Sequence, residues 1–256
     1  MDVQLLVQNV GGMAAARVPG ALAQCAGCDV YGFVETMLTD DTVHELDGLL
    51  PGYQSYHCVR PRPSRGRPHG GIAVFVRRQS PLFEGAGLRV TCDPSAGIVW
   101  LVVPRLALTV AVCYFSPHGS AVYSSGVVAP DPLAALLAGL RAAEARGDKH
   151  IVLGDLNIRI GTLSCDVPFN TAVPPGLSDP SVFPPLHHLL GVPAHRRSQD
   201  LAVPNRARAV ELLQGLFSVS SVVLNGRAPG DEEGAHTCLS NPLSEAPVGA
   251  SVVDLA

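Results

Sequence analysis

Polar residues that could bind a metal ion or a phosphate lie directly after three short apolar runs of the sequence. They are Asn9, Glu35, Asp155 and Asn157. The runs cover residues 3–8, 29–34 and 150–153, and they predict buried strands. Because ligands gather at the carboxyl ends of strands in α/β folds, we expect these side chains to converge on one pocket.

The chemistry of these side chains favours a hard cation. All of them offer oxygen atoms, and oxygen ligands without a His or Cys cluster suit Mg²⁺, with Mn²⁺ as a second option. One carboxylate that binds the metal and a second that positions a water are the minimum for hydrolysing a phosphodiester. Taken singly, Glu35 is typical of a cap or a surface group, and the sequence from Gly154 to Asn157 is typical of a turn. The order of all these residues along the chain therefore carries the prediction.

The elements that must position these residues alternate between strands and helices, which predicts one α/β domain over residues 1–256. The expected strands cover residues 3–8, 29–34, 70–76, 88–91, 98–103, 106–114, 150–153, 219–224 and 237–239. The expected helices cover residues 14–25, 40–50, 131–147 and 207–217. The clearest helix has Asp131 as its N-cap and Pro132 at its first position, and it ends at Gly147. Residues 161–205 are rich in Pro, Ser and Asp and predict a long loop or insertion.

Composition excludes several classes of protein. The chain has 256 residues, of which 47% are hydrophobic and 16% charged, so disorder is excluded for most of it. The net charge of −4 leaves no global field that would attract nucleic acid. The N-terminus lacks the basic segment and cleavage site of a signal peptide, and no uncharged stretch predicts a membrane span. Seven scattered Cys residues are typical of reduced thiols in an intracellular protein.

One segment is strongly basic despite the acidic balance of the whole chain. Residues 48–83 hold six Arg and no acidic residue. Arg is suited to bidentate contacts with phosphate, but a solvated, Pro-rich loop would explain the same pattern. The sequence favours neither interpretation over the other. The candidates for phosphate-backbone binding are Arg60, Arg62, Arg65 and Arg67.

Two further motifs are better explained by structure than by function. Cys25 and Cys28 have the C-x-x-C spacing, but a zinc site needs a second pair, and none follows at a suitable distance. Buried or helix-end thiols are the favoured interpretation. His187 and His188 lie in the Pro-rich insertion, where a solvated loop is favoured over a metal site.

The motifs taken together resemble the endonuclease/exonuclease/phosphatase superfamily, which includes abasic-site endonucleases and the deoxyribonuclease I group. Segments 8–13, 32–36 and 70–74 resemble its W-N-x-R-G-L motif, its Q-E-T motif and its glycine-led strand. Segments 112–117 and 151–158 resemble its Y-x-P-P region and its G-D-F-N motif, the most specific of the series. The late motifs resemble most closely the endonuclease domains of LINE-type retrotransposons, and they lie at residues 224–227, 230–231, 236–238 and 251–254.

The resemblance implies a fold and a role for each matching residue. The fold would be a four-layer α/β/β/α sandwich with two stacked, mostly antiparallel sheets. Glu35 would be the main Mg²⁺ ligand with Asn9 beside it, and Asp155 would orient or deprotonate the attacking water. Asn157 and Tyr114 would bind the scissile phosphate. Asp254 would orient the catalytic histidine, and the supporting residues would be Asn225, Thr237 and Ser251.

One departure from the family pattern concerns its closing S-D-H motif. The motif is absent from this sequence, which stops two residues after Asp254. We therefore expect the last strand of one sheet to be missing, the domain to be truncated before S-D-H, and cleavage by this chain to be impaired.

Three functions follow from these observations. The first is a Mg²⁺-dependent DNA endonuclease of retrotransposon type that nicks one strand, with a reverse transcriptase region downstream in an intact element. Such an enzyme would be an intracellular monomer, nuclear if active, with no membrane partner. The second is an inositol or lipid phosphatase, or an exonuclease, of the same superfamily. The third is an inactive remnant that binds nucleic acid, which the absent S-D-H motif favours.

Overall fold

The structure is a computed structural model that divides into two compact units, Met1–Leu156 and Asn157–Ala256, which we describe separately. It describes residues 3–12, 27–60, 69–83, 87–117, 119–124, 131–161, 163, 203–221, 223, 238–239, 250–251 and 254–255. The predicted insertion at 161–205 lies almost entirely outside these residues.

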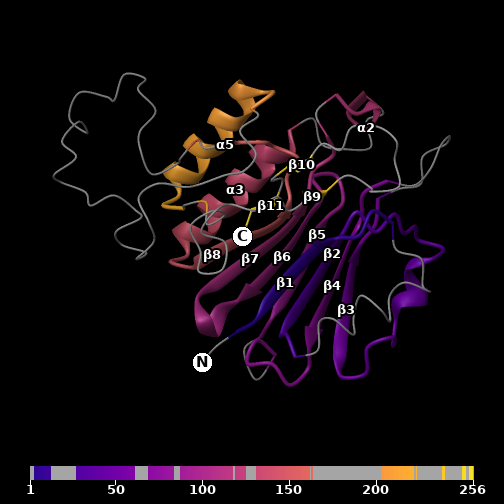
Figure 1. The fold of residues 1–256 in the computed structure, drawn as a ribbon. Coiled ribbons are helices and arrows are strands. Elements are labelled where there is room, and N and C mark those ends of the chain that lie inside the picture. The colour runs from indigo at the N-terminus through magenta and orange to yellow at the C-terminus, as the bar shows by residue number, and fades with distance from the viewer. Residues whose placement is uncertain are drawn as a thin grey trace. The chain divides into compact units, whose positions relative to one another are not determined.

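Two stacked sheets form the first unit (Figure 1). The first sheet has the order β1-β2-β4-β3, and the strands of the second sheet that belong to this unit have the order β8-β7-β6-β5. The strands of the first sheet are β1 (Leu5–Asn9), β2 (Val30–Val34), β3 (Tyr53–Cys58) and β4 (Ile72–Arg77). The strands of the second sheet are β5 (Arg89–Asp93), β6 (Ile98–Val103), β7 (Leu108–Tyr114) and β8 (Lys149–Asp155). Among the described strand pairs of this unit, β1–β2 and β7–β8 are parallel and the other four are antiparallel, so the sheets are mostly antiparallel, as expected.

Period-2 alternation along the strands builds the core between the sheets. Successive side chains of a strand point to opposite faces, so alternate residues share a face. The inward faces of both sheets contribute one apolar cluster, which includes Val30, Ile72, Val74, Val99, Leu101, Val110 and Val112. Gly32 lies in this interface, where an added Cβ would stand 2.8 Å from Val7 and 3.1 Å from Val112. The absent side chain therefore allows β2 to approach the second sheet closely.

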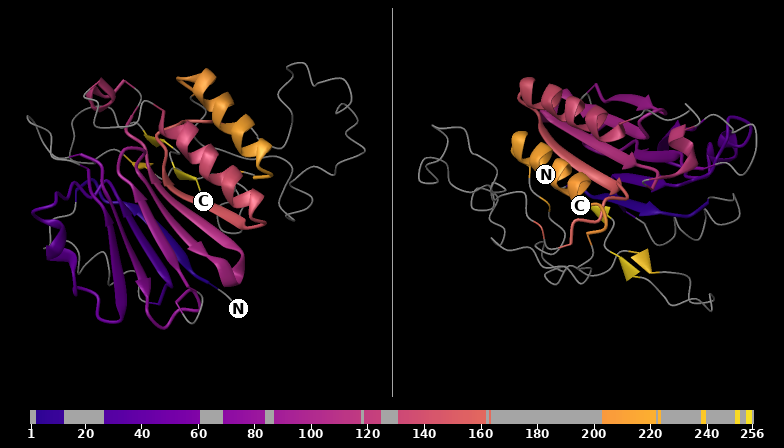
Figure 2. Two further views of the ribbon diagram at one scale, coloured as in Figure 1. Left: turned by 180° about the vertical axis from the view of Figure 1, so that it is seen from behind. Right: turned by 90° about the horizontal axis from the view of Figure 1, so that it is seen from above.

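Outer layers cover both sheets. Helix α3 (Pro132–Ala145) lies on the outer face of the second sheet (Figure 2). Its N-cap is Asp131, whose Oδ1 accepts hydrogen bonds from the amides of Leu133 and Ala134, both at 3.1 Å, as the sequence predicted. The outer face of the first sheet packs against the segment that holds η2 (Val43–Leu46), whose Leu46 is fully buried. The sandwich therefore has the expected layers.

Gly139 marks the contact between α3 and β6. A Cβ at this position would overlap the indole ring of Trp100. Alanine favours helices over glycine by about 1 kcal/mol, but overpacking a well-packed contact costs about 1–3 kcal/mol. We therefore expect Gly139→Ala to lower the free energy of unfolding, measured by urea denaturation. Ala138 is exposed on the same helix, so Ala138→Gly gives the propensity effect alone. A Gly139→Ala protein more stable than the parent would contradict this packing.

The second unit contains one long helix and three short strands. Helix α5 (Arg206–Ser218) begins at Asn205, whose side chain accepts a hydrogen bond from the amide of Arg208 at 3.1 Å. Strand β9 (Cys238–Leu239) pairs antiparallel with β10 (Ala250–Ser251), and β11 (Asp254–Leu255) lies near the C-terminus.

Some expected elements differ from those observed. The helix expected at 40–50 is only the single turn η2, and the strand expected at 219–224 is not formed at its described residues 219–221 and 223. Strand β3 was not predicted, because its sequence mixes polar and aromatic residues without an apolar run. The helix expected at 14–25 lies outside the described residues. Within the described part of the chain, no helix has the length and apolarity that crossing a membrane requires.

Candidate functional site

Strand alternation places polar side chains just beyond the apolar interface of the two sheets. Asn9 has the same parity as the inward-facing Leu5 and Val7 of β1, and Asp155 continues Ile151 and Leu153 of β8. Asn9 and Asp155 are the last residues of their strands. Their side chains therefore follow directly after the inward-facing apolar residues of β1 and β8.

Asn9 and Asp155 meet although 146 residues separate them along the chain. The Asn9 amide Nδ2 donates a hydrogen bond to Asp155 Oδ2 at 2.8 Å. The side-chain oxygen of Asn9 accepts from the amide of Gly11 at 3.0 Å, which fixes which end of the amide faces Asp155. Asp155 is 4% exposed, so this contact orients a buried carboxylate.

Glu35 follows β2 in a strained backbone conformation. Its φ is 58°, in the left-handed region that L-residues other than Asn and Asp rarely adopt. Three hydrogen bonds hold the turn: Gly12 donates to the Glu35 carbonyl at 2.8 Å, Thr36 donates to the Gly71 carbonyl at 3.2 Å, and Met37 donates to the Gly70 carbonyl at 2.8 Å. Strand alternation would place Glu35 on the face opposite Val34, and the turn interrupts that alternation. Strain that is held by several contacts points to a functional residue.

Tyr114 joins the group from the end of β7, in register with Asp155 of β8. Tyr114 is 4% exposed, and its phenol lies close to the Glu35 carboxylate. Burial first, and then repulsion by the charges of Glu35 and Asp155, raise the pKa of Tyr114 above its usual range. Tyr114 therefore stays protonated at neutral pH and acts as a hydrogen-bond donor.

Arg60 is buried, whereas the basic segment led us to expect an exposed arginine that contacts a nucleic-acid backbone. Its side chain is 4% exposed. Its guanidinium donates to Ser116 Oγ at 2.7 Å and to the Tyr114 carbonyl at 3.2 Å. By the period of two it continues the inward face of Tyr56 and Cys58, which is why it enters the protein rather than solvent.

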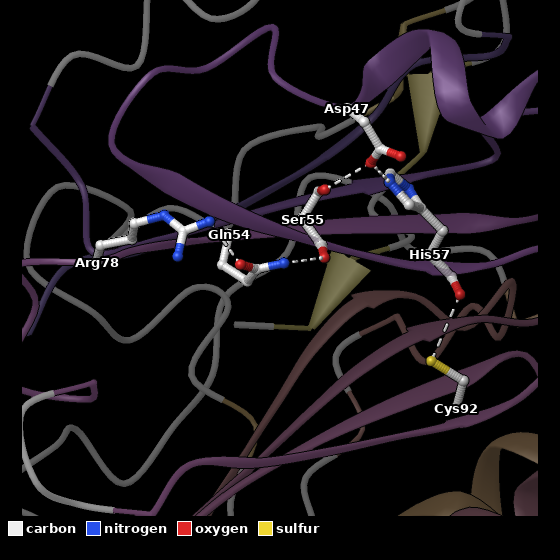
Figure 3. Close-up of polar contacts among 6 residues, drawn as sticks. All are labelled: Asp47, Gln54, Ser55, His57, Arg78 and Cys92. Carbon is white, nitrogen blue, oxygen red and sulfur yellow. Dashed lines mark hydrogen bonds and ion pairs between the residues drawn. The ribbon is translucent and has the colours of Figure 1, made fainter.

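A second polar cluster in this unit lies at the outer edge of the first sheet (Figure 3). Asp47 Oδ1 accepts a hydrogen bond from Ser55 Oγ at 2.8 Å and lies 3.2 Å from His57 Nε2. The hydrogen bonds from Ser55 and from His57 lower the pKa of Asp47. Ser55 contacts the carboxylate rather than the imidazole, so these residues fasten η2 to β3 and do not form a nucleophile with its base.

The strand-end group fits a hard divalent cation in its chemistry. Asn9, Glu35 and Asp155 supply amide and carboxylate oxygens, which suit Mg²⁺ or Mn²⁺. Within the described ranges no group of three or more His, Cys, Asp or Glu residues could hold a metal ion. Any metal at this site would therefore depend on two carboxylates, completed by neutral oxygens or water.

The remaining predicted residues stay predictions. Asn157 begins the second unit with φ 49°, and the backbones of Ser251 and Asp254 lie in β10 and β11. The others lie outside the described residues, and they are Arg62, Arg65, Arg67, Asn225 and Thr237. The sequence analysis did not identify Ser116 as a partner of Arg60, and it did not predict that Arg60 is buried. The alternation of side chains along β3 could have indicated that Arg60 points inward.

Comparison with known proteins gives one family and several structural neighbours. The profile of the Endonuclease/Exonuclease/phosphatase family matches residues 6–210. No curated protein matches this chain significantly.

Three solved structures illustrate the structural neighbours. The chain is similar to the AP endonuclease LMAP from Leishmania major, with 18% identity over 62% of this chain and 56% of that one, and a TM-score of 0.45. It is similar to a 3′-5′ exonuclease from Neisseria meningitidis, with 19% identity over 62% of this chain and 59% of that one, and a TM-score of 0.43. The catalytic domain of APE2 from Xenopus laevis gives 18% identity over 70% of this chain and 64% of that one, and a TM-score of 0.43. The matches span less than two thirds of each of these three structures.

Proposed function

The chain belongs to the endonuclease/exonuclease/phosphatase family, and from that membership we propose that its strand-end residues hydrolyse phosphodiester bonds. The observation that carries the proposal is the buried contact between Asn9 and Asp155, with the Tyr114 phenol and the Glu35 carboxylate close to each other. The group combines an oriented carboxylate, a second carboxylate and a protonated donor. These are the parts that a phosphodiesterase needs.

Each residue of the group has a distinct task in this proposal. Glu35 and Asn9 would hold the Mg²⁺, which would supply charge stabilisation at the phosphate. Asn9 fixes the orientation of Asp155, and that carboxylate orients a water or accepts its proton. Tyr114 donates a hydrogen bond toward the charge that develops on the phosphate oxygens.

DNA is the proposed substrate, and a single-strand nick of retrotransposon type is the proposed product. The LINE-like late motifs and the basic segment support this choice. In an intact element the nick would prime a downstream reverse transcriptase, and the nucleus would be the place of action.

A plasmid-nicking assay tests the proposal. We expect the chain to convert supercoiled DNA to relaxed circles with Mg²⁺, slowly because of the impaired cleavage predicted from the sequence, and to stop when EDTA is added. Parallel reactions with 3′-phosphorylated oligonucleotides and with inositol polyphosphates separate a nuclease from a phosphatase. If the chain hydrolyses inositol polyphosphates alone, the proposal of a DNA substrate is wrong and a phosphatase function takes its place. If no substrate is hydrolysed in any reaction, the proposed function is refuted.

The basic loop gives a prediction on binding. Replacing Arg62, Arg65 and Arg67 together with Ala should weaken DNA binding equally for all sequences, because binding to phosphates carries no sequence information. The slope of log K against log salt should fall by about 0.9 for each phosphate that the loop no longer neutralises. Fluorescence anisotropy at several salt concentrations measures both effects. An unchanged affinity and slope would show that the loop is only a solvated connection.

A further inference from the structure

Arg60 is a buried cation that touches the Tyr114 side chain. Its Cζ lies 5.6 Å from the centre of the Tyr114 ring, within the range of a cation–π contact. The same guanidinium donates to the carbonyl of Tyr114 and to Ser116 Oγ. One side chain therefore fixes both the backbone and the ring of Tyr114 at the end of β7.

The site of the guanidinium is built for it by two glycines. A Cβ at Gly70 would stand 2.8 Å from Arg60 Nη1, and a Cβ at Gly97 would stand 2.7 Å from Nη2. Gly97 also accepts a hydrogen bond from the Tyr114 amide at 2.9 Å. The chain thus leaves room for a large cation at this point.

The charge of Arg60 has no carboxylate partner among the described residues. Its hydrogen-bond partners are a hydroxyl and a carbonyl, and its Nε is buried without a hydrogen bond. Burying an unpaired cation is costly, so packing alone does not account for an arginine here. The ring it faces belongs to Tyr114, whose phenol lies close to the Glu35 carboxylate.

We propose that Arg60 is a positioning residue that holds the Tyr114 phenol in the direction of the reacting phosphate, through the cation–π contact with its ring and the hydrogen bond to its carbonyl. This inference rests on the proposed phosphodiesterase function. Arg60 does not touch the substrate, so its effect passes through Tyr114. A misplacement of about 1 Å at a reacting group can cost about 10²-fold in rate.

A kinetic cycle tests how Arg60 acts. Arg60→Met should lower kcat about 10²-fold and leave KM unchanged, because substrate contacts remain in place. Arg60→Lys keeps the cation and should recover part of the loss. In a Tyr114→Phe background, Arg60→Met should cause no further loss, since no phenol remains to be positioned. Arg141→Met, on the exposed face of α3, is the matched control and should match the parent.

A spectroscopic measurement tests the contact independently of activity. The full chain labelled with 3-fluorotyrosine has five tyrosine signals, and Tyr114→Phe identifies the one from Tyr114. Arg60→Met should move that signal at neutral pH, and Arg141→Met should leave it in place. If the parent chain cleaves no substrate but this signal moves, the proposed function fails while the contact is supported. An unmoved signal, or an equal loss of kcat with and without the Tyr114 hydroxyl, would overturn the inference.

Discussion

We expect that replacing Asp155 with Asn lowers the rate of DNA nicking by about 10²–10⁴-fold, the range typical of removing a general base. The amide keeps the volume of the carboxylate and one oxygen that can accept from Asn9, so the fold is retained. It cannot accept a proton at neutral pH, and it binds a divalent cation less strongly. Initial nicking rates at saturating Mg²⁺ and DNA measure the loss.

Asp148→Asn is the matched control for this substitution. Asp148 also accepts hydrogen bonds through its carboxylate, from Thr109 at 2.8 Å and from Arg146 at 3.0 Å, but it lies at the opposite end of β8. These contacts lower the pKa of Asp148, so it adds stability above its unfolded pKa and loses that stability as pH falls through its folded pKa. Asp148→Asn should therefore lower stability near neutral pH without lowering the nicking rate of the folded protein. Equal rate losses in both variants would remove Asp155 from the chemistry.

Strand patterns allow much of the first unit to be predicted from sequence. The apolar runs that end at Asn9 and Asp155 are β1 and β8, and the capped helix after Asp131 is α3. The sequence predicted that Asn9 and Asp155 lie in one pocket, but not the hydrogen bond between them, because strand ends alone do not show which side chains touch. That pairing depends on how the two sheets stack.

Arg60 shows a second limit of sequence reasoning. A basic segment in an acidic chain suggests an exposed surface, since charged residues are rarely buried. Composition does not say to which side of a strand a residue points. Tyr56 and Cys58 of β3 face the core, and Arg60 follows them at the same spacing of two residues. The sequence did not predict β3, because this strand has no apolar run, so the direction of the Arg60 side chain could not be predicted either.

The conformation of Glu35 could not be predicted at all, because no glycine or asparagine marks the turn. An L-residue in the left-handed region costs about 1–2 kcal/mol, and the contacts with Gly12, Gly70 and Gly71 hold it there. Natural proteins break local rules of this kind mainly at functional sites. The strain at Glu35 therefore predicts that stability and activity respond differently to its replacement.

We expect Glu35→Gln to lower nicking activity at least about 10²-fold at limiting Mg²⁺, because loss of a direct ligand exceeds the effect of losing a residue that only orients one. Higher Mg²⁺ should restore part of the rate, and isothermal titration with Mg²⁺ should show weaker binding. Glu35→Gly should lose activity equally but change the free energy of unfolding by less than about 1 kcal/mol, since relief of the left-handed strain offsets the greater freedom of the unfolded chain. Urea denaturation of both variants separates the two effects. A Glu35→Gly protein destabilised well beyond that limit would show that Glu35 serves the fold, and full activity in Glu35→Gln would remove it from the metal site.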